Sequence, residues 1–367
     1  MSARPPHEKA DLFVSGTEGF HTYRIPSLFV TRAGTVLAFC EGRRNDGGDH
    51  GEIALLVKRS EDNGLTWSAQ QAVWSDPPNT CGNPCPVQDP ATGAIWLAMN
   101  WNRPGRGSDD FFRFYDGRHV FMAESSDDGR AWTPPRDITA DVKPRHWGWH
   151  ATGPGIGIAL SCGPRRGRLL IPCNHSEAQG DPVRFGSHVI YSDDHGQTWR
   201  LGGRTEAVGL DECQVAELDD GRILLNARTS NANHPRRRIT VSRDGGDSWS
   251  PVRDDENLTD STRDCMGCQG SLIRGADGAL FFSHPAGSAR ERMTVWRSRD
   301  EGATWPVMRL LHEGPSAYSC LAGLPDGRIA CLYECGRKHA YETIVFAGVS
   351  QEWLLGRLPG DHERNQA

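Results

Sequence analysis

Few groups of residues in this chain combine a reactive type with a spacing that predicts chemistry. Cys265 and Cys268 have the spacing of half a zinc site, but no second such pair completes a four-ligand set. His50 and His150 likewise lack a metal-ligand pattern, so we expect no metal. The segment 43–52 follows an apolar run and contains three glycines, so its carboxylates are expected on a mobile loop. A carboxylic acid on such a loop suits general acid catalysis.

The elements that must position these residues are marked by five copies of an octapeptide, S-x-D-x-G-x-x-W. The copies span residues 60–67, 125–132, 192–199, 242–249 and 298–305. In a tight β-turn the Asp accepts hydrogen bonds from turn amides, and the Gly supplies a backbone angle that a side chain would resist. The Trp covers the hairpin with a large apolar plate. The repeat therefore predicts hairpin corners, with strands on either side.

The spacing of the copies predicts the architecture. Consecutive repeat tryptophans stand 50 to 67 positions apart, which suits one four-stranded sheet with its loops. Radial repetition of such sheets is a β-propeller. Alternating runs at 35–39, 222–226, 238–242 and 328–332 predict strands, and no long stretch has a helical period. We therefore predict an all-β propeller of four-stranded antiparallel sheets in one domain, 11–357, with flexible tails at 1–10 and 358–367.

Composition excludes several classes of protein. The net charge of −6 and the pI near 6.2 argue against a nucleic-acid-binding surface. Nothing longer than a strand is continuously apolar, so no membrane span is expected. The amino terminus lacks the apolar core of a signal peptide. We therefore expect a cytoplasmic protein whose 11 cysteines are reduced.

Tyr23-Arg24-Ile25-Pro26, taken together with the octapeptides, resembles the sialidase (neuraminidase) superfamily, in which the repeat is called the Asp box. Further segments agree in order with that family: EGRR at 41–44, DECQVAEL at 211–218, LNAR at 225–228, AYS at 317–319 and CLYE at 331–334. The resemblance extends from about residue 23 to residue 350. It implies a six-bladed propeller with five Asp-box hairpins, one blade closed by both chain ends, and a site at the central end.

The resemblance implies that Arg24, Arg228 and Arg290 bind the substrate carboxylate. Sialic acid carries this carboxylate on its anomeric carbon, so its site must hold a permanent negative charge. An arginine fork grips a carboxylate in plane and does not lose its proton. Arg292 is the alternative for the third position. Arg43, from the EGRR segment, is expected to contact the bound sugar.

The resemblance also implies that Tyr333 in CLYE is the nucleophile and that Glu212 in DECQ is its base, with Tyr318 as the alternative tyrosine. A carboxylate nucleophile would be repelled by the carboxylate on the anomeric carbon, whereas a neutral phenol would not. A free phenol has a pKa near 10, so it needs an adjacent base at neutral pH. Glu334, beside Tyr333, is expected to be structural.

Asp49 is expected to be the acid/base residue, because the corresponding family Asp lies five or six places after an Arg and Asp49 lies six after Arg43. Asp46 is the alternative. Trp149 belongs to a segment that resembles a family loop near the site, and Asn100 is expected to contact the acyl arm of the sugar.

These residues predict a retaining exo-α-sialidase that needs no cofactor. It would hydrolyse terminal sialic acid from glycoproteins, glycolipids or oligosaccharides through a glycosyl-tyrosine intermediate. Two alternatives are a non-catalytic propeller that binds sialylated glycans and a trans-sialidase. The sequence leaves open the linkage and the choice between N-acetyl, N-glycolyl and deaminated sialic acids.

Overall fold

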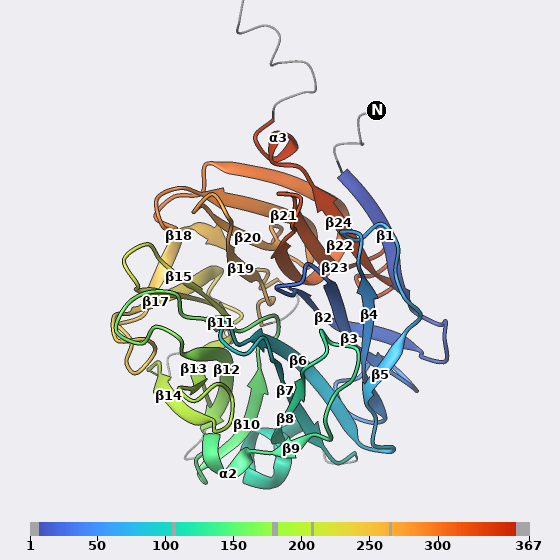
Figure 1. Ribbon diagram of the computed structural model, residues 1–367, viewed down its shortest axis with the longest axis vertical. Coiled ribbons are helices and arrows are strands. Elements are labelled where there is room, and N and C mark those ends of the chain that lie inside the picture. The colour runs from blue at the N-terminus through green and yellow to red at the C-terminus, as the bar shows by residue number, and fades with distance from the viewer. Residues whose placement is uncertain (1–6, 105–107, 178–182, 207–208, 264–265, 357–367) are drawn as a thin grey trace, which may run out of the picture.

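Antiparallel sheets arranged around a common centre make up the protein (Figure 1). The computed structural model describes residues 7–104, 108–177, 183–206, 209–263 and 266–356. One sheet joins β2 (Thr22–Val30), β3 (Val36–Arg43), β4 (Ile53–Ser60) and β5 (Gln71–Trp74) to β6 (Thr80–Gln88), β7 (Ile95–Asn102), β8 (His119–Ser125) and β9 (Arg136–Asp137). A single parallel contact, Ile53 with Thr80, links its two halves. The fold is thus all-β, as predicted.

The remaining strands form three more sheets. The first contains β10 (Trp147–Thr152), β11 (Ile158–Ala159), β12 (Leu169–Glu177), β13 (Arg184–Ser192) and β14 (Arg200–Arg204). The second contains β15 (Leu210–Glu217), β16 (Ile223–Thr229), β17 (Arg236–Ser242) and β18 (Arg253–Thr259). The third contains β19 (Ser271–Arg274), β20 (Leu280–Pro285), β21 (Glu291–Ser298), β22 (Val307–Gly323), β23 (Ile329–Cys335), β24 (Thr343–Val349) and β1 (His7–Val14).

Helical segments are short in the described part of the chain. They are α1 (Ser108–Arg113), the 3-10 turn η1 (Tyr115–Gly117), α2 (Thr139–Val142) and α3 (Gln351–Leu354). None of these helices is long and apolar enough to cross a membrane. The ten cysteines that the structure describes are free thiols, while Cys265 of the Cys265–Cys268 pair lies outside the described residues.

The Asp-box hairpins have the hydrogen bonds expected from their sequence. In the first copy, Asp62 Oδ1 accepts from Thr66 N at 2.8 Å, and Ser60 Oγ accepts from Gly64 N at 2.8 Å. Gly64 has a φ of +87°, the left-handed conformation that glycine adopts readily. The same serine-to-glycine bond recurs at the other four corners, with lengths of 2.8 to 2.9 Å. The predicted corner chemistry is confirmed.

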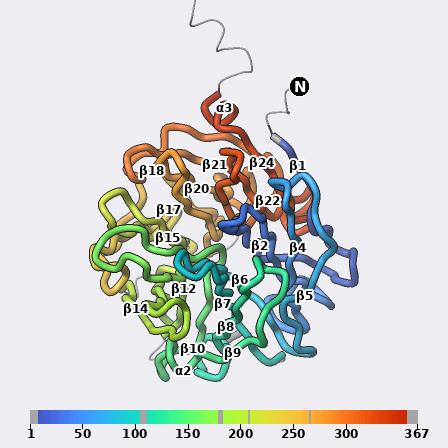
Figure 2. Tube along the Cα trace, in the orientation of Figure 1, coloured from blue at the N-terminus to red at the C-terminus, as the bar shows by residue number. Residues whose placement is uncertain are grey.

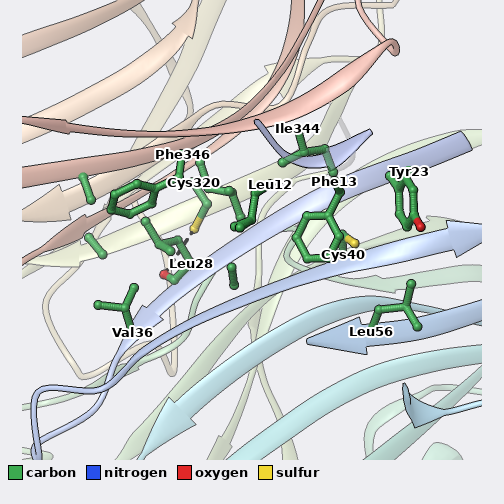
Figure 3. Close-up of a cluster of buried hydrophobic side chains, with 14 of the residues drawn as sticks. Leu12, Phe13, Tyr23, Leu28, Val36, Cys40, Leu56, Cys320, Ile344 and Phe346 are labelled. Carbon is green, nitrogen blue, oxygen red and sulfur yellow. Dashed lines mark hydrogen bonds between the residues drawn. The ribbon is translucent and has the colours of Figure 1, made fainter. Parts of the chain in front are cut away.

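Both ends of the described chain meet in one sheet, where β1 pairs with β24 (Figure 2). Residues 7–10, which the sequence placed in a flexible tail, form the first half of β1, whereas 1–6 and 358–367 lie outside the described residues. Figure 3 shows Phe13 from β1 packed in the same cluster as Leu28 and Phe346. Burying these apolar side chains between the first and last strands closes the ring of sheets.

The strands nearest the centre are irregular where they present polar residues. Register shifts interrupt β2 between Arg24 and Ser27, β6 between Gly82 and Cys85, β10 between Trp147 and His150, β15 between Leu210 and Cys213, and β22 between Ser316 and Ser319. Such bulges redirect a side chain out of the regular alternation. Several residues at or beside these shifts, among them Asn83, Glu212 and Tyr318, line one pocket.

Candidate active site

Three arginines from distant strands surround one tyrosine ring. The guanidinium carbons of Arg24, Arg228 and Arg290 lie 5.1, 6.0 and 5.3 Å from the centre of the Tyr318 ring. Arg24 lies on β2, Arg228 on β16, and Arg290 immediately before β21. The structure thus brings together the three arginines that the resemblance selected.

Arg24 is held in place by a buried carboxylate. Its Nε donates to Glu334 Oε1 at 2.7 Å, and the same oxygen accepts from Ile25 N at 2.8 Å. The other oxygen of Glu334 accepts from Tyr318 N at 3.1 Å. The guanidinium also lies 4.0 Å from the centre of the Tyr341 ring. Glu334 therefore fixes both the first arginine and the backbone of Tyr318.

The other two arginines are oriented by different partners. Arg228 Nη2 donates to Asp211 Oδ2 at 2.7 Å, whereas Arg290 Nη1 donates to the Tyr341 hydroxyl at 2.9 Å. Arg292, the alternative third arginine, has a side chain that is 46% exposed and that lies 4.0 Å from Glu313. The geometry favours Arg290.

The tyrosine beside Glu212 is Tyr318, which corrects the assignment of Tyr333. The Tyr318 hydroxyl donates to Glu212 Oε1 at 2.8 Å and accepts from Arg228 Nη1 at 2.8 Å. Tyr333 is 1% exposed and belongs to an apolar core cluster. In the β22–β23 ladder Tyr333 pairs with Ser319, so the two side chains lie on the same face of the sheet. The adjacent Tyr318 lies within the register shift between Ser316 and Ser319 and lines the pocket.

Burial shifts the pKa values of both Glu212 and Tyr318. It raises the pKa of Glu212 above the usual range, although Arg228 opposes the shift. Burial also raises the pKa of Tyr318, again opposed by Arg228. A glutamate with a raised pKa is a stronger base, and its hydrogen bond to the phenol puts it in position to take the phenolic proton.

Asp49 lies on the loop between β3 and β4, with its side chain 75% exposed. Its Oδ1 is 2.7 Å from Arg43 Nη1 and 3.9 Å from Arg24 Nη1. Desolvation raises the pKa of Asp49, but Arg43 and Arg24 outweigh this effect and lower it to about 2. Asp46 instead accepts a hydrogen bond from Gly48 N within the loop. The geometry favours Asp49 over Asp46 as the residue that faces the arginines.

The wall formed by β6 to β10 contains residues that the sequence did not indicate. Trp149 lines the pocket as expected, and its ring lies 4.0 Å from the guanidinium carbon of Arg118. Arg118 Nη2 donates to Asn83 Oδ1, and Phe112 lies beside Trp149 with ring centres 5.3 Å apart. Arginine is abundant in this chain and no motif marks Arg118, so only the fold could reveal it.

Asn100 does not reach the pocket, contrary to expectation. It is completely buried, and its Nδ2 donates to the carbonyls of His119 and His150 at 3.0 Å each. Its Oδ1 accepts from Thr152 N at 2.9 Å. Because backbone groups use its amide, Asn100 ties β7 to β10 and is a structural residue.

The pocket between these walls has a volume of about 190 Å³. Its lining includes Ile25, Glu41, Arg43, Asp49, Asn83, Phe112, Arg118, Trp149, Phe185, Asp211, Glu212, Arg228, Met266 and Tyr318. A larger cavity of about 490 Å³ lies among Ile156, Val215, Leu272 and Arg274. That cavity contains none of the predicted site residues, so volume alone does not identify the site.

A group of buried histidines on β10, β12 and β13 has the residue types of a metal site. His150 and His188 lie with their Nε2 atoms 3.0 Å apart, and Cys173 completes a set whose ligand atoms are all within 4.8 Å of one another. The Nδ1 atoms of His188 and His175 are also 3.0 Å apart. Burial lowers the pKa of each ring, so the three form a hydrogen-bonded chain of neutral imidazoles. None of them contacts Tyr318 or Glu212 in the described structure.

Comparison with known proteins places this geometry in context. The BNR repeat-like domain model matches residues 34–331. A sialidase from Micromonospora viridifaciens is 37% identical over 96% of this chain, which spans 55% of that protein's length. Sialidase-2 of Mus musculus is 30% identical, with 94% of this chain and 96% of the mouse protein covered. The structure of the Hadza microbial sialidase Hz136 superposes with a TM-score of 0.81 at 28% identity, covering 93% of this chain and 68% of that one.

Proposed function

Because this chain belongs to the sialidase family of BNR-repeat glycoside hydrolases, we propose that it is a retaining exo-α-sialidase acting on sialylated glycans. The observation that carries the proposal is the 2.8 Å hydrogen bond from Tyr318 to Glu212 within a cluster of three arginines. A neutral-sugar glycosidase would have no use for that much positive charge around its nucleophile.

In the proposed first step, Arg24, Arg228 and Arg290 hold the substrate carboxylate by charge-assisted hydrogen bonds. The Tyr318 oxygen attacks the anomeric carbon while its proton passes to Glu212. The bond to the leaving group breaks, and Asp49 gives its proton to the departing oxygen. In the second step Asp49 takes a proton from water, which attacks the same carbon. The tyrosine oxygen then leaves and recovers its proton from Glu212, so configuration is retained.

Asp49 must carry a proton to act as the acid, although its pKa in the free site is about 2. Arg43 and Arg24 lower that pKa, and the substrate carboxylate brings a negative charge to Arg24. An added negative charge beside a carboxylate raises its pKa. Substrate binding therefore favours the protonated form of Asp49, which is the form that acts as the acid.

We also propose that the sheets divide into six blades. The long strand β22 contributes its first half, Val307 to Pro315, to the β19–β21 sheet and its second half to β23, β24 and β1. The single contact between β4 and β6 divides the eight-stranded sheet in the same way. These two divisions turn four hydrogen-bonded sheets into six units.

A fluorogenic aryl sialoside tests the function. The wild type should release the aryl group, and Tyr318→Phe should lower kcat by at least about a thousandfold because the covalent step loses its nucleophile. Tyr333→Phe is the matched control and should keep activity within a few-fold, since that ring lies in the core. Loss of activity in Tyr333→Phe together with an active Tyr318→Phe would reverse the assignment. A wild type without turnover would favour a propeller that only binds.

A further inference from the structure

We propose that Arg118 is a specificity residue that reads the substituent on the sugar carbon opposite the anomeric carbon. It would donate to an acceptor oxygen on that substituent and exclude a cationic group. This inference rests on the proposed function, because it assumes that the sugar carboxylate occupies the arginine cluster around Tyr318.

The first argument is the incomplete pairing of Arg118. Its side chain is buried, at 2% exposure, and its contacts are one hydrogen bond to Asn83 Oδ1 and the face of Trp149. By contrast, Arg24 and Arg228 each have a carboxylate oxygen at 2.7 Å. Within the described part of the chain, no carboxylate lies within 4.0 Å of Arg118. A buried guanidinium without such a partner is costly unless a ligand supplies an acceptor.

Electrostatics agree with this argument. Burial lowers the pKa of Arg118 to about 10, because desolvation penalises the charged form more than Glu41 and Asp49 compensate from a distance. Burial would lower the pKa of Arg228 as well, but Asp211 and Glu212 outweigh it and raise that pKa far above its usual value. A pKa perturbed by burial inside a pocket, as that of Arg118 is, is typical of functional residues.

The second argument is position. Arg118 immediately precedes β8 and stacks on Trp149 of β10, whereas Arg290 and Tyr318 come from β20–β22. In Figure 1 these two groups of strands lie on opposite sides of the centre. Arg118 and Tyr318 nevertheless line the same pocket. A ligand held at Tyr318 therefore extends toward Arg118.

The geometry of the sugar ring then determines which substituent lies near Arg118. In a six-membered pyranose ring, C2 and C5 are opposite corners. When the carboxylate on C2 is bound by the arginine cluster, the C5 substituent points to the wall of Arg118, Trp149 and Phe112. An acylamido or hydroxyl group there offers an acceptor oxygen to the guanidinium. A free amine at C5 is an ammonium at neutral pH, and a buried cation repels it.

Four aryl sialosides that differ only at C5 test the inference: acetamido, hydroxyl, hydrogen and amine. In the wild type, kcat/KM for the C5-hydroxyl glycoside should exceed that for the C5-hydrogen glycoside by at least about tenfold, as expected for a hydrogen bond to a charged group. The C5-amine glycoside should be the poorest substrate. In Arg118→Met the hydroxyl-to-hydrogen ratio should fall to about one, and the amine should gain relative to the hydrogen compound.

Folding is controlled separately. Methionine matches the length of arginine and removes a buried charge, so Arg118→Met should fold, and Arg118→Gln serves as a second variant. Arg136→Met, on the exposed strand β9 of the same sheet, should keep the wild-type ratios. Unchanged ratios in both Arg118 variants, with the acetamido glycoside still hydrolysed, would overturn the role of Arg118 and leave the proposed function standing. A wild type inactive on all four glycosides would overturn both.

Discussion

At the scale of single residues, the proposed mechanism depends on charges whose balance would change when substrate binds. Asp49 is the clearest case, because two arginines hold it ionised in the free site. Tyr318 and Glu212 are opposite in character, since burial makes the neutral form of each more favourable. When the phenolic proton passes to an ionised Glu212, one negative charge moves from the carboxylate to the phenol oxygen, so no pair of opposite charges is created in the buried site.

Binding of the 2,3-unsaturated sialic acid analogue should therefore take up a proton. Its carboxylate raises the pKa of Asp49 from about 2, so a proton is bound at any pH between the free and bound values. Affinity should fall as pH rises through that window. Calorimetric titration near pH 4 in two buffers of different ionisation enthalpy measures the uptake. Asp49→Asn should abolish it, and equal uptake in that variant would assign the proton elsewhere.

The acidic limb of kcat/KM should report Glu212. In the proposed mechanism the carboxylate must be ionised to accept the phenolic proton, and burial raises its pKa above the ordinary value of about 4.3. Activity should thus decline with falling pH at a higher pH than an unperturbed glutamate would give. A pH–rate profile of the wild type locates the limb, and a limb at or below pH 4 would contradict the burial argument.

At the scale of elements, each Asp-box hairpin fixes a corner against the neighbouring sheet. Gly64 has a φ of +87°, and a Cβ there would lie 2.3 Å from the ring of Phe346 on β24. Gly327 has a nearly equal φ of +85° but open space around it. Both substitutions to Ala add the same backbone strain, so their difference isolates the close approach to Phe346.

Gly64→Ala should therefore destabilise the protein more than Gly327→Ala, by about 1–3 kcal/mol of overpacking. Chemical denaturation of the two variants gives the difference in unfolding free energy. Equal losses of unfolding free energy in the two variants would mean that the approach of Gly64 to Phe346 adds nothing to the effect of the substitution.

At this scale, the sequence predicted the hairpin corners but not which strand residues turn toward the pocket. The hairpin corners were predictable because Ser60, Asp62 and Gly64 bond to one another over a few positions. The choice between Tyr318 and Tyr333 was not, because both sit in strands and a register shift in β22 decides which one turns toward the pocket. Arg118 was hidden for a similar reason, since its pocket exists only when β8 and β10 are brought together.

At the scale of the whole molecule, closing the ring and building the site depend on the same seam. β1 and β24, from opposite ends of the chain, pair in one sheet, and their side chains pack with those of β2 and β3. Across this seam Arg24 of β2 meets Glu334 of β23 at 2.7 Å. An open ring would therefore separate the first arginine from the carboxylate that orients it.

Two neighbouring positions on β1 test the seam. Phe13 is 1% exposed, with its ring centre 5.5 Å from that of Tyr23, whereas Val14 is 40% exposed. Phe13→Ala should cost about 3–5 kcal/mol of unfolding free energy because it leaves a cavity between the first and last sheets. Val14→Ala should change it by less than about 0.5 kcal/mol. If denaturant unfolding and thermal loss of sialoside hydrolysis both shift in Phe13→Ala alone, the ring closes through β1. Similar shifts in the two variants would place the stabilising contacts of the seam elsewhere.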